Sequence, residues 1–166
     1  MTSIYPIPRQ ATRFSLPIAI DVRLVSMETA RAVLGFTAET VTELAEDHLA
    51  AWPGEKNRGA AHLPAFDFNL GTKGKTRELR IWAGALRGAA SPGLEAIIAD
   101  CLLTDAEGLA RRDHHLWSSQ LERAWCLSNQ KILRLIQAGE VRGVKMGRNW
   151  RVNRFSAAAF LRRRAV

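Results

Sequence analysis

Apolar residues recur at helical spacing between residues 116 and 138, on both sides of a short polar turn. The first predicted helix has an apolar face made of Leu116, Leu121, Ala124 and Trp125. Ser128 is a typical N-cap for a second helix, from Asn129 to Ala138, and Gly139 is the residue expected just after its end. The apolar face of this second helix consists of Ile132, Leu135 and Ile136. The pattern therefore predicts two helices joined by a tight turn at Leu127.

Alternating residues after these helices predict a β-hairpin. Residues 144–146 and 150–152 flank the turn Gly147-Arg148-Asn149. Asn153 is a typical cap for a last helix, from Arg154 to about Arg164. We expect its buried side to consist of Phe155, Ala158, Ala159 and Leu161. Helix, tight turn, helix, two-stranded wing and helix is the layout of a winged helix-turn-helix.

A similar pattern precedes this one. Residues 1–20 contain three prolines and predict an extended arm. Ser26 is a plausible helix start, Gly35 interrupts the helix, and Thr37 caps a second one from Ala38 to Asp47. The first of these helices has an apolar face made of Val25, Ala30, Val33 and Leu34. The segment Glu55–Pro64 is a predicted loop. AFDFNL and RELRIW then alternate around GTKGK, which predicts a hairpin with a long basic tip.

The two patterns align as an internal repeat. At a shift of 91 positions Val25 meets Leu116, Gly35 meets Cys126 and Thr37 meets Ser128. At a shift of 71 the segment RELRI (77–81) resembles RNWRV (148–152). The difference between the shifts predicts about twenty extra residues in the first copy. We assign them to the loop around Glu55–Pro64.

Between the copies, Ser91-Pro92-Gly93 breaks the chain and residues 94–112 predict one amphipathic helix or two short ones. This segment suits a rigid connector or a dimer surface. The expected fold class is α+β, mostly helical, with two winged helix-turn-helix modules joined by a helical connector. The expected domains are the arm (1–20), an N-terminal module (21–90), the connector (91–114) and a C-terminal module (115–166).

Charge is distributed unevenly between the two halves. Residues 1–100 contain 11 Lys and Arg and 11 Asp and Glu, whereas residues 101–166 contain 13 and 5. The entire net charge of +8 therefore lies in the C-terminal 66 residues. Arginine dominates there, and its planar fork suits phosphates and guanine edges. This distribution favours a polyanionic partner.

The segment from Leu116 to Arg163 resembles the small DNA-binding domain of phage excisionases and MerR-like regulators. The resemblance rests on ILRLIQAGEV after the cap, on VKMGRNWRV as the wing, and on the final helix rich in Ala, Leu and Arg. Residues 25–86 resemble it more weakly. One departure is Cys126, because the family usually has glycine in the turn between the first two helices. Proteins of this kind bind short DNA sites, often cooperatively, bend DNA and help to assemble an integrase complex.

In a helix-turn-helix the second helix enters the major groove, and its outward residues meet base edges. The outward residues expected here are Asn129, Gln130, Lys131, Arg134 and Gln137. Asn and Gln pair with adenine, whereas Arg and Lys pair with guanine. Arg148 at the wing tip, with Lys145 and Arg151 on its strands, is expected to meet phosphates or the minor groove. Ser128 offers a further phosphate contact at the helix N-terminus.

The first module carries different chemistry. Its second helix presents the carboxylates of Glu39, Glu43, Glu46 and Asp47, which DNA phosphates would repel. We therefore expect this helix to face a protein partner or another subunit. Its hairpin still offers a basic set to the DNA backbone, namely Lys73, Lys75, Arg77 and Arg80. A merely soluble hairpin tip is an equally good interpretation of GTKGK.

Other site chemistry has little support in the sequence. His114 and His115, taken with Cys101 or Cys126, lack metal-ligand spacing, so no metal site is expected. No catalytic residue or cofactor is expected either, because P-loop, GxSxG and carboxylate–His motifs are missing from the sequence. Trp125 and Trp150 fall at core positions. Two cysteines, a poor signal-peptide pattern and no long apolar run favour a cytoplasmic, nucleoid-associated bacterial protein without a membrane partner.

These observations predict a non-enzymatic, sequence-specific protein that binds double-stranded DNA. The resemblance implies an excisionase, also called a recombination directionality factor, or a small transcriptional regulator of a mobile element or phage. An integrase or another DNA-bound protein is then a possible partner, as is a cooperative array of copies. Two alternatives stay open. One is a DNA recognition protein like a phage terminase small subunit, and the other is an adaptor that binds a protein through its acidic first module.

Overall fold

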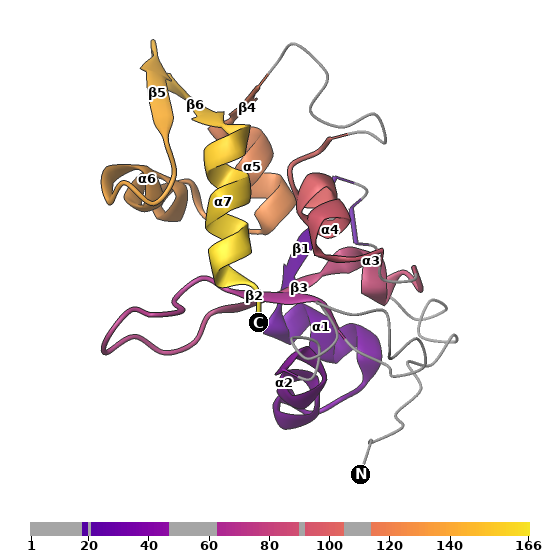
Figure 1. The fold of residues 1–166 in the computed structure, drawn as a ribbon. Helices are drawn as coiled ribbons and strands as arrows, with labels where there is room; N and C mark the ends of the chain where they lie inside the picture. The colour runs from indigo at the N-terminus through magenta and orange to yellow at the C-terminus, as the bar shows by residue number, and fades with distance from the viewer. Residues whose placement is uncertain (1–17, 20, 47–62, 90–91, 105–113) are drawn as a thin grey trace.

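The chain repeats one order of elements, namely strand, helix, helix, strand, strand and helix (Figure 1). The computed structural model describes residues 18–19, 21–46, 63–89, 92–104 and 114–166. The first unit consists of β1 (Leu24–Ser26), α1 (Met27–Leu34), α2 (Ala38–Glu46), β2 (Ala65–Asp67), β3 (Leu79–Trp82) and α3 (Ala83–Leu86). After α4 (Leu94–Cys101), the second unit consists of β4 (His115–Trp117), α5 (Ser118–Trp125), α6 (Asn129–Gln137), β5 (Gly143–Met146), β6 (Asn149–Asn153) and α7 (Arg154–Arg164). The fold is thus α+β.

Each unit contains a three-stranded antiparallel sheet with its third strand in the middle, in the orders β1-β3-β2 and β4-β6-β5. Val25 lies opposite Ile81 in the first sheet, and Leu116 lies opposite Val152 in the second. These pairs reproduce the shifts of 91 and 71 found in the sequence. The strands β1 and β4 were not predicted, because a run of three residues is too short to show alternation.

The extra residues of the first unit lie in two places, and their assignment to one loop was wrong. Ala65 and Gly143 are equivalent, because they pair with Ile81 and Val152, and they are 78 positions apart. The shift therefore falls from 91 to 78 between α2 and β2, and from 78 to 71 within the hairpin. The loop between β2 and β3 is long for this reason.

Helix starts follow the predicted capping residues. The side chains of four residues accept a hydrogen bond from a backbone N–H in the first turn, namely Ser26, Thr37, Ser128 and Asn153. Each such cap satisfies a donor that the helix itself leaves unpaired. The turn residues Gly35 and Cys126 both adopt the left-handed conformation, with φ of 69° and 50°. The cysteine thus takes the conformation for which glycine is usually required.

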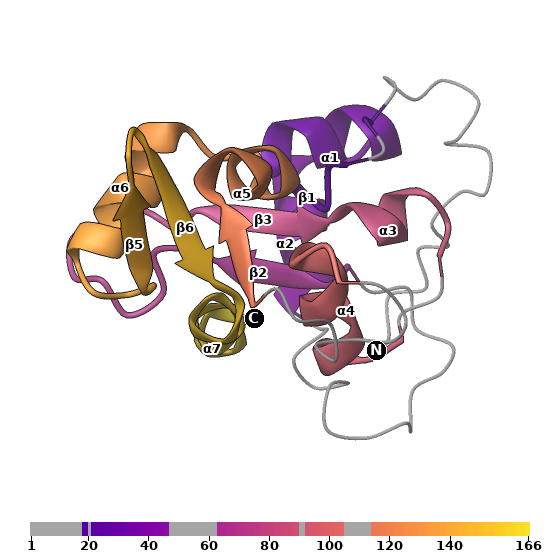
Figure 2. The same cartoon turned by 90° about the horizontal axis from the view of Figure 1, so that it is seen from above.

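The two units lie against each other (Figure 2), and one continuous core of buried side chains joins them. Phe68, which follows β2, packs edge-on against Trp125 of α5 and Phe160 of α7, with centroid distances of 5.5 and 5.3 Å. The C-terminal residues extend the first sheet, because Ala165 bridges to Phe66 beside β2. The units therefore pack directly on each other as well as being joined through α4.

The described part of the segment between the units contains one short helix. The helix α4 ends at Cys101, and its apolar residues Ile97 and Ile98 are buried inside the chain. Its exposed Glu95 forms an ion pair with Arg162 of α7, at 2.7 Å. This apolar side of α4 is therefore intramolecular and is not a dimer surface. Residues 105–112 of the predicted connector lie outside the described residues, as do Asp47 and residues 1–17 and 20 of the predicted arm (1–20).

The last helix buries a different face from the predicted one. Phe155 is 48% exposed, whereas Phe160 is fully buried and Ala157 replaces Ala159 in the core. The run AAAFL is apolar on several sides, so its spacing could not select a face. Trp125 is buried as predicted, but Trp150 is only half-buried.

No helix within the described residues combines the length and the apolar character that a membrane crossing requires. Within those same ranges, His, Cys, Asp and Glu side chains do not gather in threes or more around a possible metal position.

Candidate nucleic-acid interface

The exposed face of α6 carries three polar side chains in one line. Gln130, Arg134 and Gln137 are spaced by four and three positions, so they share a face, and all three are exposed. The opposite face buries Ile132 and Leu135. No side chain in the described part of the structure engages the Arg134 guanidinium. This line of donors and acceptors is chemically suited to base edges.

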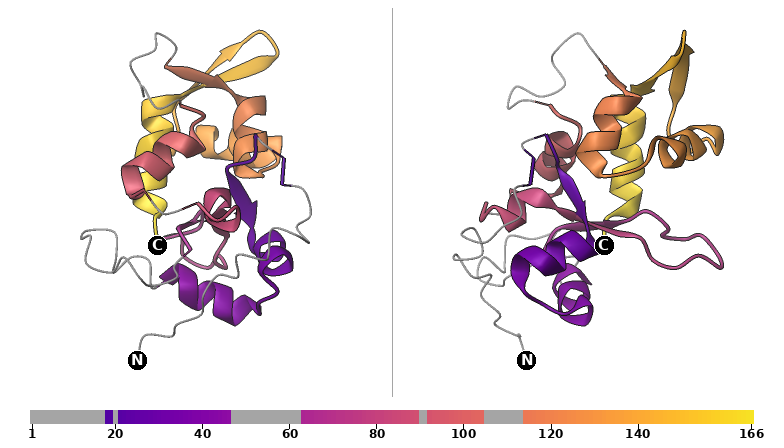
Figure 3. Two further views of the ribbon diagram at one scale, coloured as in Figure 1. Left: turned by 90° about the vertical axis from the view of Figure 1, so that its right-hand side faces the viewer. Right: turned by 180° about the vertical axis from the view of Figure 1, so that it is seen from behind.

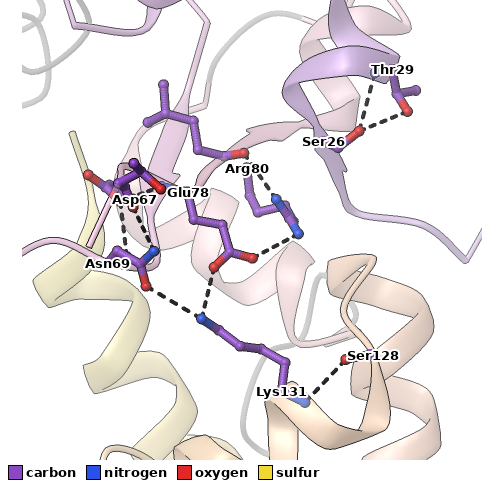
Figure 4. Close-up of polar contacts among 10 residues, drawn as sticks. Ser26, Thr29, Asp67, Asn69, Glu78, Arg80, Ser128 and Lys131 are labelled. Carbon is purple, nitrogen blue, oxygen red and sulfur yellow. Dashed lines mark hydrogen bonds and ion pairs between the residues drawn. The ribbon is translucent and has the colours of Figure 1, made fainter. Parts of the chain in front are cut away.

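Lys131 was expected on the same outward face, and the structure corrects this. Its Nζ donates to Glu78 Oε2 at 2.8 Å and lies 3.4 Å from Asn69 Oδ1 (Figure 4). The side chain is 22% exposed and points from the flank of α6 toward the loop between β2 and β3. Sequence patterns could not predict this contact, because Glu78 lies 53 residues earlier in the chain.

The N-terminus of α6 is open to solvent. Ser128 and Asn129 are both exposed. The Ser128 Oγ accepts the backbone N–H of Lys131 at 3.2 Å, and its own hydroxyl proton is still able to donate. The partial positive charge of the helix N-terminus favours an anion here. The sequence predicts a phosphate contact for Ser128 and a base contact for Asn129, and both side chains are accessible for such contacts.

The hairpin of the second unit, β5–β6, has an exposed basic tip. Lys145 and Arg148 are exposed, and Gly147 adopts a φ of 63° in the tight turn between the strands. Arg151 is placed differently, because its guanidinium lies 4.8 Å from the ring centroid of Trp117 on β4. Lys145 and Arg148 are therefore the two predicted wing cations that project into solvent, while Arg151 stacks on the sheet.

The basic residues of the first hairpin divide into two pairs. Lys73 and Lys75 are exposed within the loop 68–78. Arg77 forms ion pairs with Glu46 of α2 and with Asp67, the latter at 3.2 Å. Arg80 pairs with Glu78 at 3.0 Å. Arg77 and Arg80 thus form ion pairs within the unit, whereas Lys73 and Lys75 are exposed.

The strands β2 and β3 are shorter than predicted because a carboxylate closes the base of the loop. Asp67 is buried, and its Oδ1 accepts the backbone N–H groups of Asn69 and Glu78, each at 3.0 Å. Across the loop, Asn69 Nδ2 donates to the carbonyl of Thr76 at 2.7 Å. These bonds replace a regular strand ladder and define the loop by side chain–backbone contacts.

Three elements project to the same side of the molecule. In Figure 1 the β5–β6 hairpin lies above α6 and the loop 68–78 lies below it, all at the left. The view from behind in Figure 3 shows the same arrangement, with α6 between the two hairpins. The two hairpins, each with exposed cations, therefore lie on either side of α6.

The helix α2 occupies the corresponding place in the first unit but has the opposite charge. The shift of 91 aligns its exposed carboxylates with the line on α6: Glu39 with Gln130, Glu43 with Arg134 and Glu46 with Gln137. In Figure 1 this helix lies at the bottom of the molecule, away from α6. The two equivalent helices therefore differ in charge, because the exposed line on α2 carries three carboxylates and the exposed line on α6 carries none.

Comparison with known proteins gives no further guide to the site, because no family model, no curated protein and no solved structure matches this chain.

Proposed function

We propose that this chain is a non-enzymatic protein that binds double-stranded DNA in a sequence-specific way. Helix α6 lies in the major groove, and Gln130, Arg134 and Gln137 contact base edges there. Lys145 and Arg148 of the β5–β6 hairpin contact the phosphate backbone beside it. Each repeated unit is then a winged helix-turn-helix, and the second unit is the one that reads DNA.

One observation carries the proposal. The exposed line on α6 combines amide and guanidinium groups without a carboxylate, and the hairpins on either side of α6 carry exposed cations. A face that serves only solubility normally mixes both signs of charge. The surplus of +8 in the C-terminal 66 residues points the same way. A polyanion with readable hydrogen-bonding edges fits this face, and duplex DNA is such a polyanion.

The finer role rests on the resemblance to excisionases and MerR-like regulators. A recombination directionality factor or a small transcriptional regulator, acting at the bacterial nucleoid beside an integrase or another DNA-bound protein, is consistent with it. A DNA recognition protein like a phage terminase small subunit is the alternative. The neighbouring genes separate these roles, since an integrase gene, a terminase large-subunit gene or neither would lie beside this one.

Selection from a pool of random duplexes tests the proposal. We expect enrichment of a short motif, and a selected duplex should bind far more tightly than a scrambled one of equal length. The affinity should also fall steeply as salt rises, because phosphate contacts release counterions. Equal binding of selected and scrambled duplexes would remove sequence specificity from the proposal, and no binding at low salt would refute it altogether.

A further inference from the structure

We infer that the loop 68–78 of the first unit is a second wing for α6, so that one DNA duplex is held by both units at once. In this composite site Lys73 and Lys75 contact the phosphate backbone on one side of α6. Lys145 and Arg148 contact the backbone on its other side. The inference rests on the proposed function and adds a role for the first unit, whose helix α2 presents carboxylates on its exposed face.

The loop is a defined structure rather than a free tip. Its base is closed by the buried Asp67 carboxylate and by the bond from Asn69 Nδ2 to the carbonyl of Thr76. Thr72 donates its backbone N–H to the carbonyl of Asn69 at 3.0 Å. A loop with such contacts presents Lys73 and Lys75 from a fixed base, which lowers the entropic cost of binding.

Two contacts fix this loop against the second unit. Glu78, at its end, bridges Arg80 of β3 and Lys131 of α6, at 3.0 and 2.8 Å (Figure 4). Arg164, at the end of α7, is buried and donates to the carbonyl of Leu70, at the beginning of the loop. The loop is thus attached to the reading helix on one side and to the C-terminal helix on the other.

Charge makes this loop compatible with DNA. Between Asn69 and Arg77 the chain carries no carboxylate, and Lys73 and Lys75 are exposed. The Glu78 carboxylate is shared by two cations, Lys131 and Arg80, so the local sum stays positive. DNA phosphates would therefore meet a positive surface along the loop.

The two hairpins lie on opposite sides of α6, and this arrangement suits a groove that has a phosphate backbone on each side. A groove is bordered by two phosphate backbones, so hairpins on opposite sides of a helix in the groove reach different backbones. The two hairpins flank α6 in Figures 1 and 3. Lys131 then acts as a positioning residue that holds the loop through Glu78, and it does not read a base.

Directed cleavage tests this geometry. An iron chelate would be attached to Thr72→Cys on the loop or to Asn149→Cys on the second hairpin, in full-length protein carrying Cys126→Ser. Both sites are exposed. On a selected duplex we expect the two probes to cut different backbones bordering the same groove. Cuts from Asn149→Cys alone would overturn the composite site while leaving the proposed function intact.

Salt titration gives an independent measure. Lys73→Gln and Lys75→Gln should each reduce the slope of log K against log salt by about 0.9, the value for one lost phosphate contact. Arg31→Gln, which removes an exposed cation on α1, is the matched control and should leave the slope unchanged. Lysine variants that behave like Arg31→Gln would refute the composite site. If the affinity of the unmodified protein for the duplex does not depend on salt, the proposed binding to DNA is itself refuted.

The ion pair between Glu78 and Lys131, which attaches the loop to α6, can be tested separately. Glu78→Gln should abolish most of the effect of Lys73→Gln on the slope, because the loop then loses its ionic attachment to α6. A Glu39→Gln variant, which removes an exposed carboxylate from α2, should leave that effect unchanged. An effect of Lys73→Gln that is equally large in both backgrounds would show that the Glu78 contact does not position the loop.

Discussion

Glu43 and Arg134 occupy equivalent positions in α2 and α6, 91 residues apart, each on the exposed face of a helix that follows the same turn. One fold thus presents a carboxylate in its first copy and a guanidinium in its second. Because a guanine edge accepts two hydrogen bonds from arginine, Arg134→Ala should weaken binding to a selected site by about 1–3 kcal/mol and relax preference at one base pair. Titration of duplexes substituted at each position measures both effects.

A matched control lies in the same unit. Arg148 at the tip of the second hairpin is exposed and is assigned to phosphate. Arg148→Ala should therefore weaken all duplexes by a similar factor and leave base preference unchanged. If Arg134→Ala also lowers the affinity of every duplex equally, α6 does not read bases.

Reversal of charge on α2 tests which helix faces DNA. The variant Glu39→Lys/Glu43→Lys adds four units of positive charge, but α2 lies away from the face formed by α6 and the hairpins. We expect affinity for a selected site to rise only slightly, through the general field of the protein, and the salt slope to stay constant. If the slope of log K against log salt becomes steeper by the amount expected for about two phosphate contacts, α2 lies on the DNA instead.

The repeated pattern allowed much of the fold to be predicted from sequence. Ser26, Thr37, Ser128 and Asn153 mark helix starts through local capping chemistry, and the shifts of 91 and 71 align the paired strands. Such features depend on neighbours along the chain. The short strands β1 and β4 were not predicted, because they are defined by their pairing with β3 and β6, which are distant in sequence.

The candidate site was harder to predict, because its details depend on contacts between units. Lys131 resembled Arg134 in sequence as an outward cation, yet Glu78 of the other unit binds it. Arg77 similarly looked available but is paired with Asp67 and Glu46. Spacing along a helix identifies a face, but it does not identify what the rest of the chain places against that face.

The pair Lys131–Glu78 should make a measurable contribution to stability. Both side chains are about three-quarters buried, with exposed fractions of 22% and 26%, so solvent screens the pair less than one at the surface. A double-mutant cycle with Lys131→Met and Glu78→Gln should give a coupling of about 0.5–1 kcal/mol in urea unfolding. Zero coupling would show that the contact does not hold the two units together.

The ion pair Glu95–Arg162 links stability to acid. The hydrogen bond from Arg162 lowers the pKa of the Glu95 carboxyl below its usual value of 4.5. A carboxyl with a depressed pKa stabilises the fold above its ordinary pKa, and this contribution is lost as pH falls through the folded-state pKa. Glu95→Gln should thus cost at most about 0.5 kcal/mol at pH 7, since both side chains are largely exposed. In strong acid, where the Glu95 carboxyl is protonated, Glu95→Gln should no longer lower the free energy of unfolding. Denaturant unfolding at pH 7 and in strong acid measures this difference, and an equal cost under both conditions would contradict the link to acid.

Cys126 offers a route to greater stability. Its φ of 50° lies in the left-handed region, which costs a residue with a Cβ about 1 kcal/mol or more, and Gly35 takes the same place in the first unit. Cys126→Gly removes that strain but adds flexibility to the unfolded chain, at a cost of roughly 0.5–1 kcal/mol. We expect the free energy of unfolding to rise by up to about 1 kcal/mol. Cys126→Val, with a branched Cβ in the same conformation, should lower it by more than about 1 kcal/mol. Equal stability of the two variants would show that the turn relaxes without cost and that the strain at Cys126 is negligible.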